Sequence, residues 1–233
     1  MDLVEIRRYP VKSMGGELLA SADLDERGLV GDRVWAVHLP DDKLGSGKNS
    51  VKGRRVAGLL ELTARTRGRT PWVDFGDGRE LAVGDPALEP ALTARLGRPI
   101  RLGLEAGLRH HDDGPVSLLT TAAMRWLGDL VGDEVAALRF RANLLVDTPG
   151  TGNPEDDWIG RTVCVGDDVR LVVRERLVRC VMIDMAQEEV AHDGRLLKAV
   201  GAHHELTFGV WATVERPGRV RVGDRVRVDG PAA

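Results

Sequence analysis

The sequence predicts a β-rich α+β fold of two parts, in which a β-rich N-terminal part is followed by an antiparallel β-barrel with helices. Runs of β-favouring residues recur along the chain, Gly- and Asp-rich turns separate them at short intervals, and few segments have helical periodicity. A length of 233 residues accommodates two small domains. We place their boundary in the turn-rich stretch RHHDDGP, giving domains at residues 1–110 and 111–233.

In the N-terminal part, strands are expected in LVEIRRYPVKS, ELLASADLD and RVWAVHL, with RGLVGDR as a turn. Asp77-Gly78 joins two extended runs and is typical of a β-hairpin, because this pair accepts positive φ angles. The segment ALEPALTARLG predicts a short helix that ends at Gly97, and PIRLGLE predicts a strand after it.

In the C-terminal part, TTAAMRWLGDLVG has a threonine cap, apolar residues at helical spacing and a glycine exit, so it predicts a helix. The region 183–206 is expected to be partly helical. Strand character and recurring Gly-Asp turns favour a closed or nearly closed antiparallel barrel. The strands are expected in RFRANLLVDT, RTVCVGDDVRLVVRERLVRCVM, FGVWATVERPG and RVRVGDRVRVDG.

The charges exclude some classes of partner. With 33 basic and 36 acidic residues the formal net charge is -3, so no overall field attracts nucleic acid or acidic lipid. No stretch approaches the roughly 20 apolar residues that span a bilayer. We expect a cytoplasmic protein that does not act on membranes, with reduced thiols at Cys164 and Cys180, which are too few for a structural zinc site.

The stretch LVRCVMIDM, residues 177–185, raises the question of what Cys180 does. If residues 177–182 form a strand, Val178, Cys180 and Met182 share one face, which is typical of a buried packing thiol. Arginines crowd the same segment, however, and nearby guanidinium groups favour the thiolate that attacks electrophiles or binds soft metals. Both interpretations remain open on this evidence.

Several other stretches carry groups that suit an anionic ligand. An extended RFRANLL places Arg139, Arg141 and Asn143 on one face, either as a solvated stripe or as donors for a phosphate or polar heterocycle. Lys12 and Ser13 precede a Met-Gly-Gly bend, and Arg33 follows a tight turn; singly, each is more often a surface feature. The stretches GSGKNSVKGRR and HHDDGP are interpreted as solvated loops.

Several stretches of the chain, read together and in order, resemble the MOSC family. They are YPVKSMGGE, GLVGDRVW, RFRANLLVD, Asp157-Trp158-Ile159-Gly160, RCVM and FGVWATVERPGRVRVGDRV. This family is named for the C-terminal domain of molybdenum cofactor sulfurase, and the form resembled here has a MOSC N-terminal β-barrel domain. The resemblance covers nearly the whole chain. Within this family, the chain is similar to the amidoxime-reducing component and its bacterial counterparts, which reduce N-hydroxylated compounds.

The resemblance implies a molybdenum cofactor, Mo-molybdopterin, with Cys180 as thiolate ligand of the metal. It implies cofactor binding by Lys12, Ser13, Arg33, Arg141, Asn143 and Arg179. The implied reaction is reduction of N-hydroxylated or N-oxide compounds. Asp184 or a histidine in a nearby loop is the candidate proton donor.

The chain departs from that family after the cysteine, where VMIDMAQ places Asp184 at a position where a hydroxyl is expected, so the substrate stays undetermined. We expect a separate soluble electron-donor protein. Pyridoxal phosphate is not expected, since no lysine lies in a recognisable aldimine-forming context. Two alternatives remain: a non-catalytic carrier of cofactor or sulfur, and a β-barrel interaction module with a structural cysteine.

Overall fold

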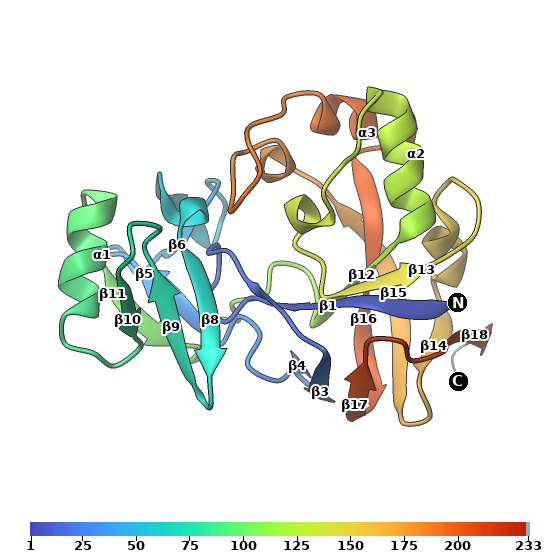
Figure 1. Ribbon diagram of the computed structural model, residues 1–233, viewed down its shortest axis with the longest axis horizontal. Coiled ribbons are helices and arrows are strands. Elements are labelled where there is room, and N and C mark those ends of the chain that lie inside the picture. The colour runs from blue at the N-terminus through green and yellow to red at the C-terminus, as the bar shows by residue number, and fades with distance from the viewer. Residues whose placement is uncertain (232–233) are drawn as a thin grey trace.

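The computed structural model describes residues 1–231 as two lobes side by side (Figure 1). The larger lobe is built on one eight-stranded sheet with the order β18-β14-β15-β16-β12-β13-β1-β2. All pairings in it are antiparallel except β12 with β13, which is parallel. Its strands are β1 (Asp2–Arg8), β2 (Glu17–Leu18), β12 (Val116–Thr120), β13 (Leu144–Asp147), β14 (Arg161–Val165), β15 (Val169–Val178), β16 (Thr207–Arg216) and β18 (Val226–Pro231).

The smaller lobe contains a four-stranded sheet, β11-β5-β6-β7, and a three-stranded sheet, β10-β9-β8. The predicted Asp77-Gly78 hairpin is confirmed between β9 and β10, and Gly78 has a φ of 88°. The strands of this lobe are β5 (Trp35–His38), β6 (Leu44–Ser46), β7 (Gly53–Arg55), β8 (Thr63–Arg67), β9 (Thr70–Asp74), β10 (Glu80–Ala82) and β11 (Arg101–Leu104).

A third small sheet connects distant parts of the chain: β17 (Gly218–Arg221) pairs with β3 (Ser21–Asp25), which pairs with β4 (Gly28–Leu29). In the same way β1, from the N-terminus, pairs with β13. Residues before position 110 therefore supply strands to sheets that are otherwise C-terminal. The domain boundary near residue 110 stays a prediction.

The two helices expected from local signals are confirmed. Helix α1 (Leu88–Leu96) ends at Gly97 with a φ of 67°, and α2 (Thr121–Val131) ends at Gly132 with a φ of 70°. The Thr120 hydroxyl caps α2 by accepting a hydrogen bond from the Ala123 amide at 3.1 Å. The remaining helical elements are α3 (Leu196–His204) and the 3-10 turns η1 (Leu59–Glu61), η2 (Ala137–Phe140), η3 (Pro154–Trp158) and η4 (Val181–Ile183).

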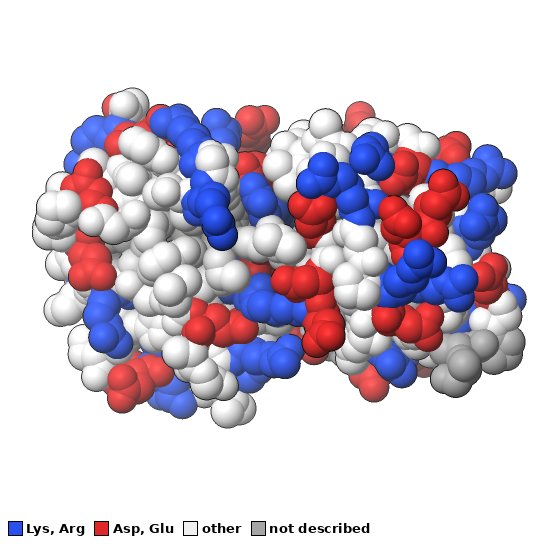
Figure 2. Space-filling model, turned by 90° about the horizontal axis from the view of Figure 1, so that it is seen from below, with Lys and Arg blue, Asp and Glu red and all other residues white. Residues whose placement is uncertain are grey.

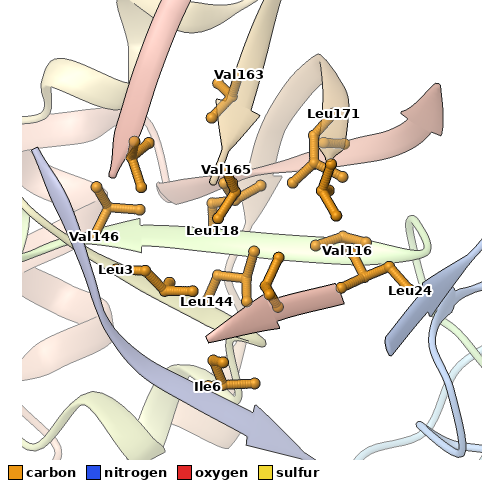
Figure 3. Packing of buried hydrophobic residues seen from close by; sticks show 14 of the residues in the cluster. Leu3, Ile6, Leu24, Val116, Leu118, Leu144, Val146, Val163, Val165 and Leu171 are labelled. Carbon is orange, nitrogen blue, oxygen red and sulfur yellow. The ribbon is translucent and has the colours of Figure 1, made fainter. Parts of the chain in front are cut away.

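Each lobe has its own apolar core. Figure 3 shows the core of the larger lobe, where Leu3, Leu118, Leu144 and Val163 from four strands pack together, all with 0% exposure. A second cluster fills the smaller lobe, and a third lies beneath α2 and α3. These separate cores fit the β-rich α+β fold that the sequence predicts, with a smaller β-lobe beside a curled sheet flanked by helices.

Two local predictions were wrong in a way that affects the site. Residues 139–143 do not form an extended strand: η2 includes Arg139, and Arg141 has a φ of 54°, so strand β13 starts only at Leu144. The predicted strand over residues 177–182 ends at Val178, and Cys180 begins the η4 turn. Contacts with distant segments, such as the hydrogen bond from Arg141 to the Met14 carbonyl, are not encoded in local β propensity.

Among residues 1–231, the helices are all too short or too polar to cross a membrane. On the face in Figure 2, basic and acidic side chains are intermixed, with no large area of one sign. This distribution agrees with the near-balanced charge of the sequence.

Candidate cofactor pocket

A pocket of about 370 Å³ contains almost all of the predicted site residues. Segments from both halves of the sequence form it: the bend after β1, the loop before β12, the η2 turn and the end of β15. The predicted residues that line it are Lys12, Ser13, Arg33, Arg141, Asn143, Arg179 and Cys180. The resemblance implied that these residues lie close together, and the structure shows that they line one pocket. Their chemical roles stay predictions.

Cys180 lies at the turn where β15 ends. Its backbone is extended, with a φ of -135°, and its side chain is partly exposed to the pocket rather than sealed in the core. Val178 and Val181 on either side are 68% and 48% exposed. A packing thiol is buried, as Cys164 is, whereas Cys180 is partly exposed and lines the pocket, so its sulfur can meet a ligand there.

Three lining residues adopt the left-handed backbone conformation, which is uncommon outside glycine: Ser13 has a φ of 64°, Arg33 of 50° and Arg141 of 54°. Each lies at a bend that brings its side chain to the pocket. Strained conformations of this kind persist where surrounding contacts hold them, and they concentrate at functional sites.

Arg33 and Arg141 both stack on the fully buried ring of Tyr9, with guanidinium carbons 4.7 Å and 4.2 Å from its centroid. Arg33 also forms an ion pair with buried Asp32 and donates to the Arg141 carbonyl at 2.9 Å. Arg141 Nη2 donates to the Met14 carbonyl at 2.6 Å. This arrangement fixes both guanidinium groups before any ligand binds.

The hydrogen bonding of Arg141 is incomplete. Its Nη1 is buried and has no acceptor within residues 1–231, and desolvation lowers the pKa of Arg141. Leaving a buried donor of a charged group unpaired is costly. Arg141 lines the pocket, so its positive charge favours an anionic ligand there.

Arg179, which precedes Cys180, also has incomplete hydrogen bonding. Its Nε donates to the Phe208 carbonyl at 2.7 Å and its Nη1 to the Phe140 carbonyl at 3.0 Å. Its Nη2 is buried without an acceptor in the described part of the chain. Desolvation lowers the pKa of Arg179 to about 10. Arg179 therefore supplies a second buried donor without a described partner, in the residue that precedes Cys180.

Lys12 is 5% exposed and is held by the loop before β12. Its Nζ donates to the His110 carbonyl at 2.7 Å and to Asp112 Oδ1 at 2.6 Å. Burial lowers the pKa of Lys12, although Asp112 opposes this. Desolvation by itself raises the pKa of Asp112, but the charge and hydrogen bond of Lys12, together with the charges of Arg33 and Lys48, lower it overall. This pair positions the lysine at the pocket wall.

Asn143 has a mainly structural set of contacts. Its side-chain oxygen accepts hydrogen bonds from the Ser117 amide at 3.1 Å and the Ser117 hydroxyl at 2.9 Å, and its Nδ2 donates to the Arg7 carbonyl at 3.3 Å. These bonds tie β12, β1 and the start of β13 together. Asn143 thereby fixes the floor of the pocket.

Asp184 is the one predicted site residue that does not line the pocket. It is 7% exposed, and its Oδ1 accepts a hydrogen bond from the Leu197 amide at 2.9 Å at the start of α3. A carboxylate at a helix N-terminus is stabilised by the free amides there, which gives Asp184 a structural reason for its position.

The loop before β12 was misjudged as a solvated surface loop. His110 and His111 are 0% and 6% exposed, and Asp112 and Asp113 line the pocket. Desolvation, with the negative charge of Asp112, raises the pKa of Asp113. The RHHDDGP stretch also brings His111 Nε2 to 3.4 Å from Asp32.

Sequence reasoning missed the roles of Lys48 and Trp211 in this pocket. Lys48 lies in the GSGKNSVKGRR loop, which was interpreted as solvated, and Trp211 lies mid-strand in β16. Gly114 lies against Trp211, since a methyl group there would be 2.1 Å from the indole Cε3. Only the fold shows that these positions meet.

A model of the MOSC domain matches residues 105–227, and a model of the MOSC N-terminal beta barrel domain matches residues 1–66. The chain belongs to the MOSC family. MOSC domains are generally associated with molybdenum cofactor binding. No curated protein gives a significant match to the sequence.

Solved structures agree at the level of the fold. The YuaD protein from Bacillus subtilis has a TM-score of 0.52 and 14% sequence identity, over 97% of this chain and 94% of its own. YiiM from Geobacillus stearothermophilus has a TM-score of 0.38 and 15% identity, over 50% of this chain and 54% of its own. The YuaD likeness spans both lobes of this MOSC protein, and the YiiM likeness is too weak to support any argument.

The lining residues fit a pterin cofactor that carries phosphate and a thiolate-binding metal. Buried N–H groups of Arg141 and Arg179 are unpaired among the residues described, Lys12 adds positive charge, and Cys180 offers a soft sulfur ligand. Within residues 1–231, His, Cys, Asp and Glu side chains do not gather in groups of three or more that could hold a metal ion by themselves.

Proposed function

We propose that this MOSC protein binds Mo-molybdopterin in the cofactor pocket and reduces N-hydroxylated or N-oxide compounds, with the Cys180 sulfur as ligand of molybdenum. The observation that supports it best is that the Cys180 thiol shares one pocket with Arg141 and Arg179, each of which has a buried N–H group without an acceptor among residues 1–231. Mo-molybdopterin needs both a soft sulfur ligand for its metal and donors for its phosphate, and this pocket offers both.

The chain's own residues would divide the binding work. Arg141 and Lys12, held by Met14 and Asp112, would bind the phosphate and the polar heterocycle. Ser13 and Arg33 would complete that wall. When bound, the cofactor supplies the two-electron and oxygen-transfer chemistry that amino-acid side chains lack.

Arg179 and Asp113 would serve the substrate end of the pocket. The guanidinium group of Arg179, which lines the pocket, would stabilise negative charge that develops on a departing oxygen. Asp113 also lines the pocket, and its raised pKa keeps more of the protonated form at a given pH. We therefore favour Asp113 over Asp184 as the proton donor. Electrons would come from a separate soluble protein.

The test is purification from a host that makes the molybdenum cofactor, followed by measurement of metal and pterin content and of amidoxime reduction with an artificial electron donor. We expect about one molybdenum per chain and turnover. Cys180→Ala should abolish turnover and lower the molybdenum content. Cys164→Ala is the matched control, because Cys164 is buried and its sulfur lies 3.2 Å from Asp229 Oδ2.

The outcomes separate the alternatives. Metal and pterin without turnover would support a cofactor carrier, and neither metal nor pterin would support an interaction module. Unchanged metal content and turnover in Cys180→Ala would remove this sulfur from the proposal.

A further inference from the structure

A second hollow, which we name the side groove, lies next to the cofactor pocket. It has a volume of about 520 Å³, within the range of about 300–1,000 Å³ that is typical of small-molecule sites. One wall comes from the loop and turn after β6, and the other from the segment that follows Cys180. Its apolar lining consists of Val56, Ala57, Leu60, Val181, Met185 and Ala186.

The side groove and the cofactor pocket adjoin one another. Lys48 lines both, and Val181 of the groove directly follows Cys180 of the pocket. Met182 also lines the pocket, and a methyl group on Gly47 of the groove would lie 3.1 Å from Met182 Cε and 3.0 Å from Leu60 Cδ1. Met182, an unbranched and adaptable side chain, therefore stands where the two hollows meet.

The two walls are joined at one end, so the groove exists before a ligand binds. The Glu188 amide donates to the Leu60 carbonyl at 3.3 Å. The Glu188 carboxylate accepts hydrogen bonds from the Gly16 amide at 3.1 Å and from Arg7 Nη1 at 3.3 Å. In Figure 1 the segment between β15 and α3 reaches across toward the lobe that contains β6.

The charges around the side groove restrict its ligand. Glu61 forms an ion pair with Arg95 at 2.7 Å, whereas Lys48 and Arg55 have no ion pair with another residue of the described range. A ligand with an apolar body and a neutral or anionic end suits this lining better than a cationic one.

We propose that the side groove binds the apolar body of the substrate while its N–O head reaches Cys180. This inference rests on the proposed function, because a cofactor in the 370 Å³ pocket would leave little of that pocket for the substrate. The preferred substrates are then alkyl or aryl N-hydroxylated compounds, rather than small polar ones such as hydroxylamine.

The test uses a homologous series of straight-chain amidoximes, from acetamidoxime upward, with the cofactor-loaded protein. Burying one methylene is worth about a fourfold gain in affinity, so Kd by calorimetry and KM should fall by about that factor with each added carbon until the groove is full. Ala57→Phe and Ala186→Phe place bulk at exposed lining positions. They should remove this dependence and leave acetamidoxime binding unchanged.

Ala202→Phe is the matched control, because Ala202 is exposed on α3 and lines neither hollow. The inference is overturned if Kd does not depend on chain length in the wild type, or if the dependence survives in both groove variants. Turnover that does not depend on chain length would contradict substrate binding in the side groove but support the proposed reductase activity. Length-dependent binding without turnover would contradict the proposed reductase activity but support substrate binding in the side groove.

Discussion

The buried carboxyl group of Glu155 lowers the free energy of unfolding when it is charged. It is 0% exposed in η3, its Oε2 accepts a hydrogen bond from the Thr120 hydroxyl at 2.6 Å, and its Oε1 has no partner in the part of the chain described. Burial raises its pKa from 4.5 to about 7. At about 1.36 kcal/mol per pKa unit, the charged form costs the folded state about 3 kcal/mol.

The sign follows from linkage between protonation and folding. Below pH 4.5 the carboxyl is protonated in both states and costs nothing. As the pH rises from 4.5 to 7 the unfolded carboxyl ionises while the folded one retains its proton, so the free energy of unfolding decreases. Above pH 7 the full penalty of about 3 kcal/mol applies.

Glu155→Gln should remove this penalty, since the amide retains an acceptor for Thr120 and carries no charge. The gain over wild type in urea unfolding should be below about 1 kcal/mol at pH 5 and about 3 kcal/mol at pH 8. Glu215→Gln, at an exposed position in β16, should show no such trend. A gain that is the same at pH 5 and pH 8 would refute the reasoning.

Three further predictions follow from single contacts. Thr120→Val removes the α2 cap and the donor to Glu155, so urea unfolding should show a loss of roughly 2 kcal/mol. Asp113→Asn should flatten the fall of turnover with rising pH, because the raised pKa of Asp113 sets that limb; an unaltered pH profile excludes it as proton donor. Gly114→Ala places a methyl 2.1 Å from Trp211, so pterin content after purification should fall, whereas unchanged content would show that the pocket tolerates the shift.

Local signals sufficed wherever an element is determined by neighbouring residues. The Asp77-Gly78 hairpin and the α1 and α2 helices with their glycine exits were predicted correctly. Positive φ at a glycine and a threonine cap are short-range effects, and they act in the same way in any fold. Sequence order also indicated the MOSC family, and with it the set of residues that meet in the pocket.

The path of the chain through the pocket needed the tertiary structure. Arg141 lies in a stretch with strand-like sequence, but its backbone has a left-handed conformation. Stacking on Tyr9 and a hydrogen bond to Met14, both more than a hundred positions away, hold it there. The HHDDGP stretch has a polar composition, yet Lys12 draws it into the pocket.

The sequence by itself determined the Asp77-Gly78 hairpin, the α1 and α2 helices, and which residues have the chemistry for a soft metal and an anion. Only the tertiary structure decided that Asp113 rather than Asp184 faces the pocket, and that a groove continues from Cys180. The physical reason is that burial and the charges around a side chain depend on segments distant in the chain, whereas turn and cap preferences depend on adjacent residues.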